Sequence, residues 1–111
     1  CPLTPATRHL INADTLALMK PTAFLINTSR GALIDEQALI RALKDHKIAG
    51  AGLDVQETEP PVKDSPLYTL DNVILTPHMG WKGLETRQRL LSILKGNIDG
   101  FINGKPVNVV S

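Results

Sequence analysis

The sequence predicts an α/β protein in which a parallel sheet is flanked by helices and followed by a long C-terminal helix. Three short apolar segments, residues 22–27, 48–55 and 73–77, alternate with stretches of helical periodicity. Short links join strands and helices, an order typical of parallel sheets. The middle segment, "IAGAGLDV", is small and apolar throughout, and "TAFLIN" also has the pattern of a buried strand. We therefore expect a sheet that is covered on both faces.

Two short helices are predicted before the first strand. Thr4 followed by Pro5 offers an N-cap and a proline at the first helical position of one of them. Either Asn12 or Asp14 is expected to cap the other.

The later helices follow from a capping residue and from apolar spacing. Asp35 is expected to cap a helix over residues 36–47. Residues 56–72 are polar and Pro-rich, and we expect a loop there with one helical turn. A long amphipathic helix is predicted over residues 85–103. Its apolar face would comprise Leu90, Leu91, Leu94, Ile98 and Phe101.

Composition excludes several classes of function. The net charge of +1 gives no reason to expect nucleic acid or an anionic membrane as a partner. No apolar run approaches the roughly 20 residues that a membrane span needs. The single cysteine, Cys1, excludes an internal disulfide and fits a reducing compartment, so we expect a cytoplasmic protein. Because the chain starts with this cysteine, in mid-pattern, we expect it to be a fragment.

Polar side chains that could carry chemistry follow all three predicted strands. Ligands of open α/β sheets bind at the carboxyl ends of the strands, so these side chains should share one edge of the sheet. The set comprises Thr28, Ser29, Arg30 and Gly31 after the first strand, Asp54, Glu57 and Glu59 after the second, and Thr76, Pro77, His78, Met79 and Gly80 after the third.

These residue types suit oxidation of a hydroxyl group that lies next to a carboxylate. A guanidinium binds a carboxylate through a planar fork, and a histidine exchanges protons near neutral pH. A carboxylate can orient that histidine, and a nicotinamide would take the hydride. Structural interpretations stay open: Arg30 can pair with a nearby carboxylate, His78 can be structural, Glu57 and Glu59 can be solvated, and Asp54 can cap a turn.

The segments "INTSRGALIDEQALIRAL", "GAGLDVQETEPP" and "VILTPHMGW" resemble the D-isomer-specific 2-hydroxyacid dehydrogenases. The preceding segment, "CPLTPATRHLINADTLALMKP", is similar to the same family, so the resemblance covers nearly the whole chain. "PHMGW" points to the glycerate dehydrogenase and hydroxypyruvate reductase branch. The resemblance implies the second half of a Rossmann-type sheet, from a domain inserted in a flavodoxin-like catalytic domain, in a protein that is usually a homodimer.

The resemblance also implies roles for individual residues. Arg30 would hold the substrate carboxylate, His78 would be the acid/base, and Glu59 would pair with His78. Asp54 would meet the nicotinamide side of the cofactor. Contacts with NAD or NADP are implied for Cys1, Thr7, Thr28, Ser29, Arg30, Asp54, His78, Met79, Gly80 and Trp81. No metal is expected, since His9 and His46 have no metal-ligand partners at useful spacing, and both are expected on helices at the surface.

Residues 1–111 would form a partial NAD(P)-binding domain. The family's G-x-G-x-x-G turn, which binds the pyrophosphate, is not found in the sequence. The resemblance implies hydride transfer between NAD(P)H and a 2-oxoacid, such as hydroxypyruvate or glyoxylate, giving the D-2-hydroxyacid glycerate or glycolate. Two alternatives stay open, a nucleotide-sensing module like the related corepressors and an inactive fragment.

Overall fold

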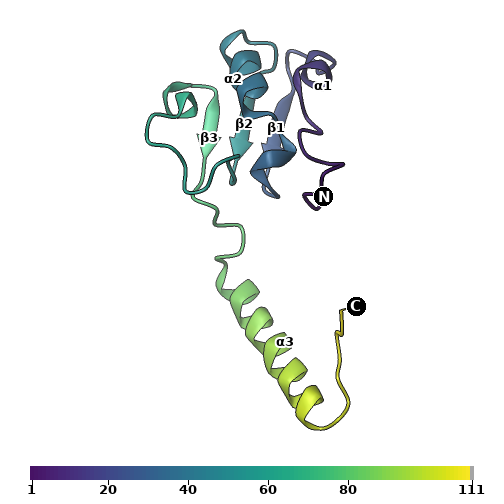
Figure 1. The fold of residues 1–111 in the computed structure, drawn as a ribbon. Coiled ribbons are helices and arrows are strands. Elements are labelled where there is room, and N and C mark those ends of the chain that lie inside the picture. Colours follow the sequence, from purple (N-terminus) through teal and green to yellow (C-terminus); the bar gives the residue numbers. More distant parts are fainter. Residues whose placement is uncertain (111) are drawn as a thin grey trace. The chain divides into compact units, whose positions relative to one another are not determined.

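The computed structural model describes residues 1–110, which divide into two compact units (Figure 1). The first unit is Cys1–His78 and carries the sheet, and the second begins at Met79 and carries a long helix. Each unit is described by itself below.

The first unit contains three strands, β1 (Phe24–Asn27), β2 (Gly50–Leu53) and β3 (Val73–Leu75). They pair in parallel in the order β1-β2-β3, with Ile26 opposite Gly52 and Gly52 opposite Ile74. The predicted parallel α/β arrangement is therefore confirmed. Because the strands are parallel, the residues that follow each of them lie at one edge of the sheet.

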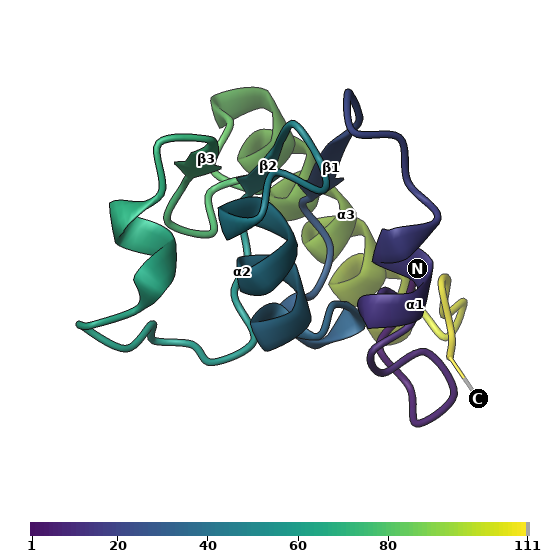
Figure 2. The same cartoon turned by 90° about the horizontal axis from the view of Figure 1, so that it is seen from above.

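Helices α1 (Ala13–Ala17) and α2 (Glu36–Lys44) cover one face of this sheet (Figure 2). Asp35 caps α2 as predicted, since its side chain accepts a hydrogen bond from the backbone N–H of Ala38 at 2.9 Å. Asn12, one of the two candidates, caps α1. The core between helices and strands contains Leu16, Leu39, Leu43, Ile48, Ala51, Leu53 and Leu67.

The opposite face of the sheet is exposed in this unit. Side chains alternate between the faces of a strand. Phe24, Ile26 and Ile74 lie on the face away from α1 and α2, and they are 69%, 67% and 72% exposed. The expectation that "TAFLIN" is buried and that the sheet is covered on both faces is therefore wrong for residues 1–78 taken by themselves, because both α-helices of this unit pack on one side.

Two predicted helices are shorter than expected. The first predicted helix, after Pro5, is a hydrogen-bonded turn that ends where His9 adopts a φ of 52° and donates its backbone N–H to the carbonyl of Ala32 at 2.9 Å. Helix α2 ends at Lys44 rather than at residue 47, because His46 has a φ of 50°. Left-handed backbone of this kind cannot continue a right-handed helix.

Two 3₁₀ helices complete the first unit. η1 (Gly31–Leu33) lies between β1 and α2, directly after Arg30. η2 (Pro66–Thr69) is the helical turn predicted in the Pro-rich loop, and its Leu67 side chain is buried in the core.

The second unit contains α3 (Leu84–Ile102), whose ends lie within one residue of the prediction. Its predicted apolar face is exposed within the described residues, where the five side chains are between 51% and 78% exposed. A hydrogen bond of 2.6 Å from Lys95 to Asp99 raises the pKa of the Lys95 amine. No helix in residues 1–110 has the length and apolar character that crossing a membrane requires.

Candidate active site

The loop after β1 is shaped by the side chain of Asn27. This buried side chain accepts a hydrogen bond from the backbone N–H of Ser29 at 3.1 Å and donates one to the carbonyl of Arg30 at 2.9 Å. Such Asx turns tie a chain to itself without a helix or sheet. The arrangement leaves the Arg30 side chain exposed, with its guanidinium donating to the carbonyl of Ser29 at 2.8 Å. Sequence reasoning missed Asn27, although an asparagine two residues before a serine at a strand end is an Asx-turn signal.

The ends of β2 and β3 are joined by Asp54 and Thr76. Asp54 is 6% exposed, and its backbone N–H donates to the carbonyl of Asn27 at 2.9 Å, which continues the sheet register. The Thr76 hydroxyl donates to the Asp54 carboxylate over a short 2.5 Å. A carboxylate is thus held in a fixed place at the sheet edge, as ligand binding requires.

Glu59 and His78 meet across the same edge. Nδ1 of His78 lies 2.8 Å from Oε2 of Glu59, and the side chains are 43% and 38% exposed. The other carboxylate oxygen of Glu59 accepts a hydrogen bond from the backbone N–H of Gln56 at 3.2 Å. An ionised carboxylate only accepts hydrogen bonds, so this pairing assigns the proton to Nδ1. His78 has a φ of 49°, a left-handed conformation for which histidine is enriched.

Two hollows open at this edge, and they share Gln56 and Glu59. One, of about 230 Å³, is lined by His78, Asp54 and Thr76. The other, of about 280 Å³, is lined by Arg30, Gly31 and Glu57. Since Glu59 borders both, Arg30 and His78 face adjoining hollows on either side of one carboxylate. The expectation that Arg30, Asp54 and His78 share one edge is confirmed.

Comparison with known proteins shows which family the chain matches. The model of the D-isomer specific 2-hydroxyacid dehydrogenase NAD binding domain matches residues 1–80. The chain is 47% identical to a hydroxypyruvate reductase of Blautia hydrogenotrophica over 100% of its own length and 34% of that protein. It is 50% identical to a glycerate dehydrogenase of Methylorubrum extorquens, over 98% of the chain and 35% of that protein.

A solved structure of a related enzyme has the same fold as this chain. An acyclic imino acid reductase, in complex with NADPH and D-Arg, superposes with a TM-score of 0.91 at 44% identity. The match covers 100% of this chain and 35% of that one. The chain belongs to the D-isomer specific 2-hydroxyacid dehydrogenase family. It spans about a third of the length of the curated relatives that it matches.

Four of the residues that the family resemblance implies as cofactor contacts lie together near the N-terminus. The Ser29 hydroxyl donates to the carbonyl of Cys1 at 2.9 Å. The Thr7 hydroxyl donates to the carbonyl of Pro2 at 2.8 Å, next to Cys1. Thr28 is exposed directly after β1. These four residues therefore lie beside the loop that carries Arg30.

Three further residues that are predicted to contact the cofactor belong to the second unit. Met79, Gly80 and Trp81 follow His78 at the start of that unit, and the Met79 and Trp81 side chains are 46% and 53% exposed. Their role as cofactor contacts stays a prediction.

His9 and Glu57 pair with each other and are both partly buried. The sequence placed His9 on the surface and left open a solvated Glu57, and the structure shows neither side chain fully exposed. Nε2 of His9 lies 2.8 Å from Oε1 of Glu57, and Arg8 donates to the same oxygen at 2.8 Å. Glu57 is consequently only 24% exposed. His46, in contrast, is exposed as expected.

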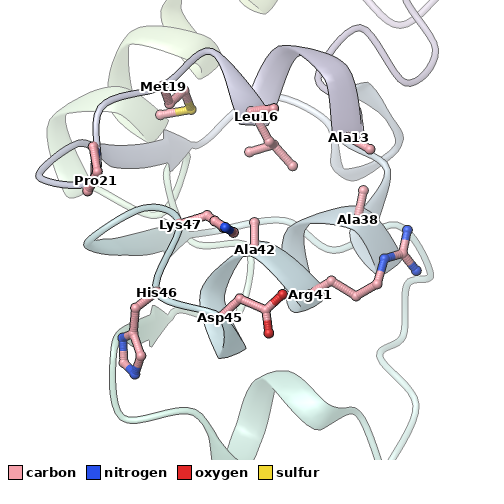
Figure 3. Close-up of a pocket in the computed structure, with 11 residues that line it drawn as sticks. Ala13, Leu16, Met19, Pro21, Ala38, Arg41, Ala42, Asp45, His46 and Lys47 are labelled. Carbon is pink, nitrogen blue, oxygen red and sulfur yellow. The ribbon is translucent and has the colours of Figure 1, made fainter.

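A larger hollow, of about 740 Å³, lies between α1 and the end of α2 (Figure 3). Leu16 of α1 and Ala42 of α2 point toward each other across it, and Arg41 and His46 also line it. None of its lining residues follows a strand, so this hollow lies apart from the residues at the strand ends. Residues 1–110 also hold no cluster of three or more histidine, cysteine or acidic side chains that could bind a metal ion.

Proposed function

We propose that the whole protein is an oxidoreductase that transfers a hydride between NAD(P)H and a 2-oxoacid, giving the D-2-hydroxyacid. Hydroxypyruvate with glycerate, and glyoxylate with glycolate, are the proposed substrate pairs, in line with the names of the relatives. The observation that carries the proposal is the shared edge, where Arg30 and the Glu59–His78 pair border adjoining hollows.

Arg30 is the proposed carboxylate-binding residue. Arg30 is exposed and lines a hollow, and its guanidinium donates to the backbone carbonyl of Ser29 rather than to an acidic side chain. The structural alternative, an ion pair between Arg30 and a neighbouring carboxylate, is therefore not formed among residues 1–110. A planar fork is the geometry that a 2-oxoacid carboxylate would use.

His78 is the proposed proton donor for reduction, and Glu59 its positioning partner. Glu59 fixes Nδ1 as the donor of the hydrogen bond between them, which assigns Nε2 to the exchange of a proton with the substrate oxygen. When the oxoacid is reduced, Nε2 gives up the proton that the substrate oxygen takes. In the reverse direction the same nitrogen takes the proton from the hydroxyl.

The donor set at the strand ends fits the nicotinamide half of NAD or NADP. The buried Asp54 carboxylate lines the same hollow as His78, and a carboxylate is an acceptor suited to a carboxamide N–H or a ribose hydroxyl. When bound, the reduced cofactor supplies the hydride. The choice between NAD and NADP is left to experiment.

Steady-state assays of the full-length protein test the proposal. Hydroxypyruvate and glyoxylate, each with NADH and with NADPH, should be reduced, as followed by loss of the reduced-nicotinamide absorbance. A 2-imino acid belongs in the same panel, because one solved relative is named an imino acid reductase. Binding of NADH without turnover of any member would contradict the proposal and support the nucleotide-sensing alternative.

Three further features form part of the proposal. Residues 1–111 are a partial NAD(P)-binding domain, the whole protein is a homodimer, and it acts in the cytoplasm. Light scattering of the full-length protein would test the dimer, and cell fractionation would test the location.

A further inference from the structure

Glu57 is the centre of a clamp that joins three distant segments of the first unit. Its Oε1 accepts hydrogen bonds of 2.8 Å from both Arg8 and His9, on the N-terminal turn. Its Oε2 makes a longer contact of 3.4 Å with the backbone N–H of Glu36, at the start of α2. Its own backbone N–H donates to the Glu36 carboxylate at 3.0 Å. One residue of a Pro-rich loop is thus held by partners 21, 48 and 49 positions away.

A second observation, independent of charge, fixes the same loop. A Cβ atom built on Gly31 would lie 1.9 Å from the carbonyl oxygen of Gln56 and 2.5 Å from the backbone nitrogen of Glu57. The backbone of the loop therefore rests directly on Gly31, the residue that follows Arg30. Only glycine permits an approach this close.

The clamped loop leads to the catalytic pair within two residues. The backbone N–H of Gln56 donates to Glu59 at 3.2 Å, and the other oxygen of Glu59 lies 2.8 Å from His78. Contacts at Glu57 and Gly31 thus set where Glu59 stands relative to both Arg30 and His78. A carboxylate that is displaced by a fraction of an ångström would orient the histidine less well.

We propose that Glu57, held by Arg8 and His9, is a positioning residue of the dehydrogenase reaction. It does not contact the substrate; it fixes the loop that presents Glu59 to His78. The inference rests on the proposed function, since its effect is read through the proton transfer assigned to His78.

The test is Glu57→Gln in the full-length protein, with kcat and KM measured for oxoacid reduction. The variant keeps the size of the side chain but loses the charge that binds Arg8 and His9. We expect kcat to fall on the order of 10-fold, with KM for the oxoacid little changed because the Arg30 side chain is not altered. Other charged or titratable groups lie near these residues. Asp54 lines the same hollow as His78, and Arg30 lines the same hollow as Glu59. Glu36, Arg8 and His9 contact Glu57.

Non-additivity separates positioning from stability. In a Glu59→Gln background the Glu57→Gln change should no longer lower kcat, because the carboxylate that it positions is already gone. A merely structural Glu57 would lower the thermal unfolding midpoint and leave kcat of the folded enzyme unchanged. The matched control is Asp64→Asn, which removes the same charge from the same loop, since Asp64 is exposed and has no hydrogen bond or ion pair within residues 1–110.

If Glu57→Gln does not fold, His9→Asn keeps the test open. Asparagine tolerates the positive φ of this position, and its side chain is too short to reach Glu57. It should lower kcat by a smaller factor. A wild-type protein that turns over oxoacids, with both variants matching its kcat, overturns the positioning inference alone. A wild-type protein without turnover overturns the proposed function and this inference with it.

Discussion

Glu59 and His78 come from loops that follow different strands, yet their side-chain atoms lie 2.8 Å apart at the carboxyl edge of the sheet. They meet because β2 and β3 are adjacent and parallel, so the segments leaving them start side by side. Glu59 also borders the hollow that contains Arg30. One carboxylate therefore stands between the group proposed to bind the substrate and the group proposed to protonate it.

Glu59→Gln should lower kcat for oxoacid reduction. The amide keeps the shape of the side chain, but it can present an N–H to Nδ1 in place of an acceptor oxygen, so the tautomer and orientation of His78 are no longer fixed. Steady-state kcat of the full-length wild type and variant measures the loss. An unchanged kcat would show that the contact with His78 has no catalytic role.

His78→Ala should reduce kcat by a factor on the order of 10² to 10⁴, since a positioned general acid contributes about that much. Cofactor binding should largely survive, because the carboxylate and hydroxyl groups of Asp54 and Thr76 remain joined. Turnover and NADH titration of the same variant separate the two effects. Equal losses in cofactor affinity and in kcat would show that His78 acts in cofactor binding instead.

Arg30→Lys should raise KM for the oxoacid strongly and lower kcat as well. Lysine keeps the charge but offers a single point donor in place of the planar fork, so both affinity and orientation of the carboxylate suffer. The measurement is a full substrate titration at saturating cofactor. An unchanged KM would rule out Arg30 as the carboxylate-binding residue. Arg41→Lys is the matched control, because Arg41 borders the hollow between α1 and α2 and not the strand ends.

The 111-residue chain by itself should bind NADH poorly. Its residues supply the nicotinamide side of the proposed site, whereas a pyrophosphate needs a glycine-rich turn and a helix N-terminus of the kind that the sequence does not contain. Calorimetric titration of the purified chain with NADH tests this. Tight, stoichiometric binding would contradict it.

Most of the fold could be predicted from local signals in the sequence. Asp35 could be identified as the cap of α2, and the ends of α3 to within one residue, because caps and apolar spacing act over a few residues. The parallel order of the strands followed from their alternation with helices. The common edge of Arg30, Asp54 and His78 followed from that order alone.

The features that could not be predicted from the sequence depend on contacts between residues far apart in the chain. The turn at His9 depends on a hydrogen bond to Ala32, and the burial of Glu57 depends on Arg8 and His9. In sequence, Glu57 is a charged residue in a Pro-rich loop, a pattern typical of solvated surface. Its partners become visible only when β2 has brought the loop against the N-terminal turn.

Gly31→Ala should destabilise the protein and impair catalysis together. The added Cβ would lie 1.9 Å from the carbonyl oxygen of Gln56, and both clashing groups are backbone, so the loop must move. Overpacking of this kind costs roughly 1–3 kcal/mol, and the displaced loop carries Glu59 away from His78. Thermal unfolding and kcat of the full-length protein measure the two effects.

Gly96→Ala is the control for that substitution, because it makes the same chemical change where a Cβ meets nothing within 4 Å. Gly96 lies in the interior of α3, where alanine is favoured over glycine by about 0.5–1 kcal/mol, so the unfolding midpoint should rise slightly and kcat should not change. The contrast between the two glycines isolates the contact with the loop. If Gly31→Ala were as stable and as active as Gly96→Ala, the loop would not rest on Gly31, and the second support for the positioning of Glu59 would be lost.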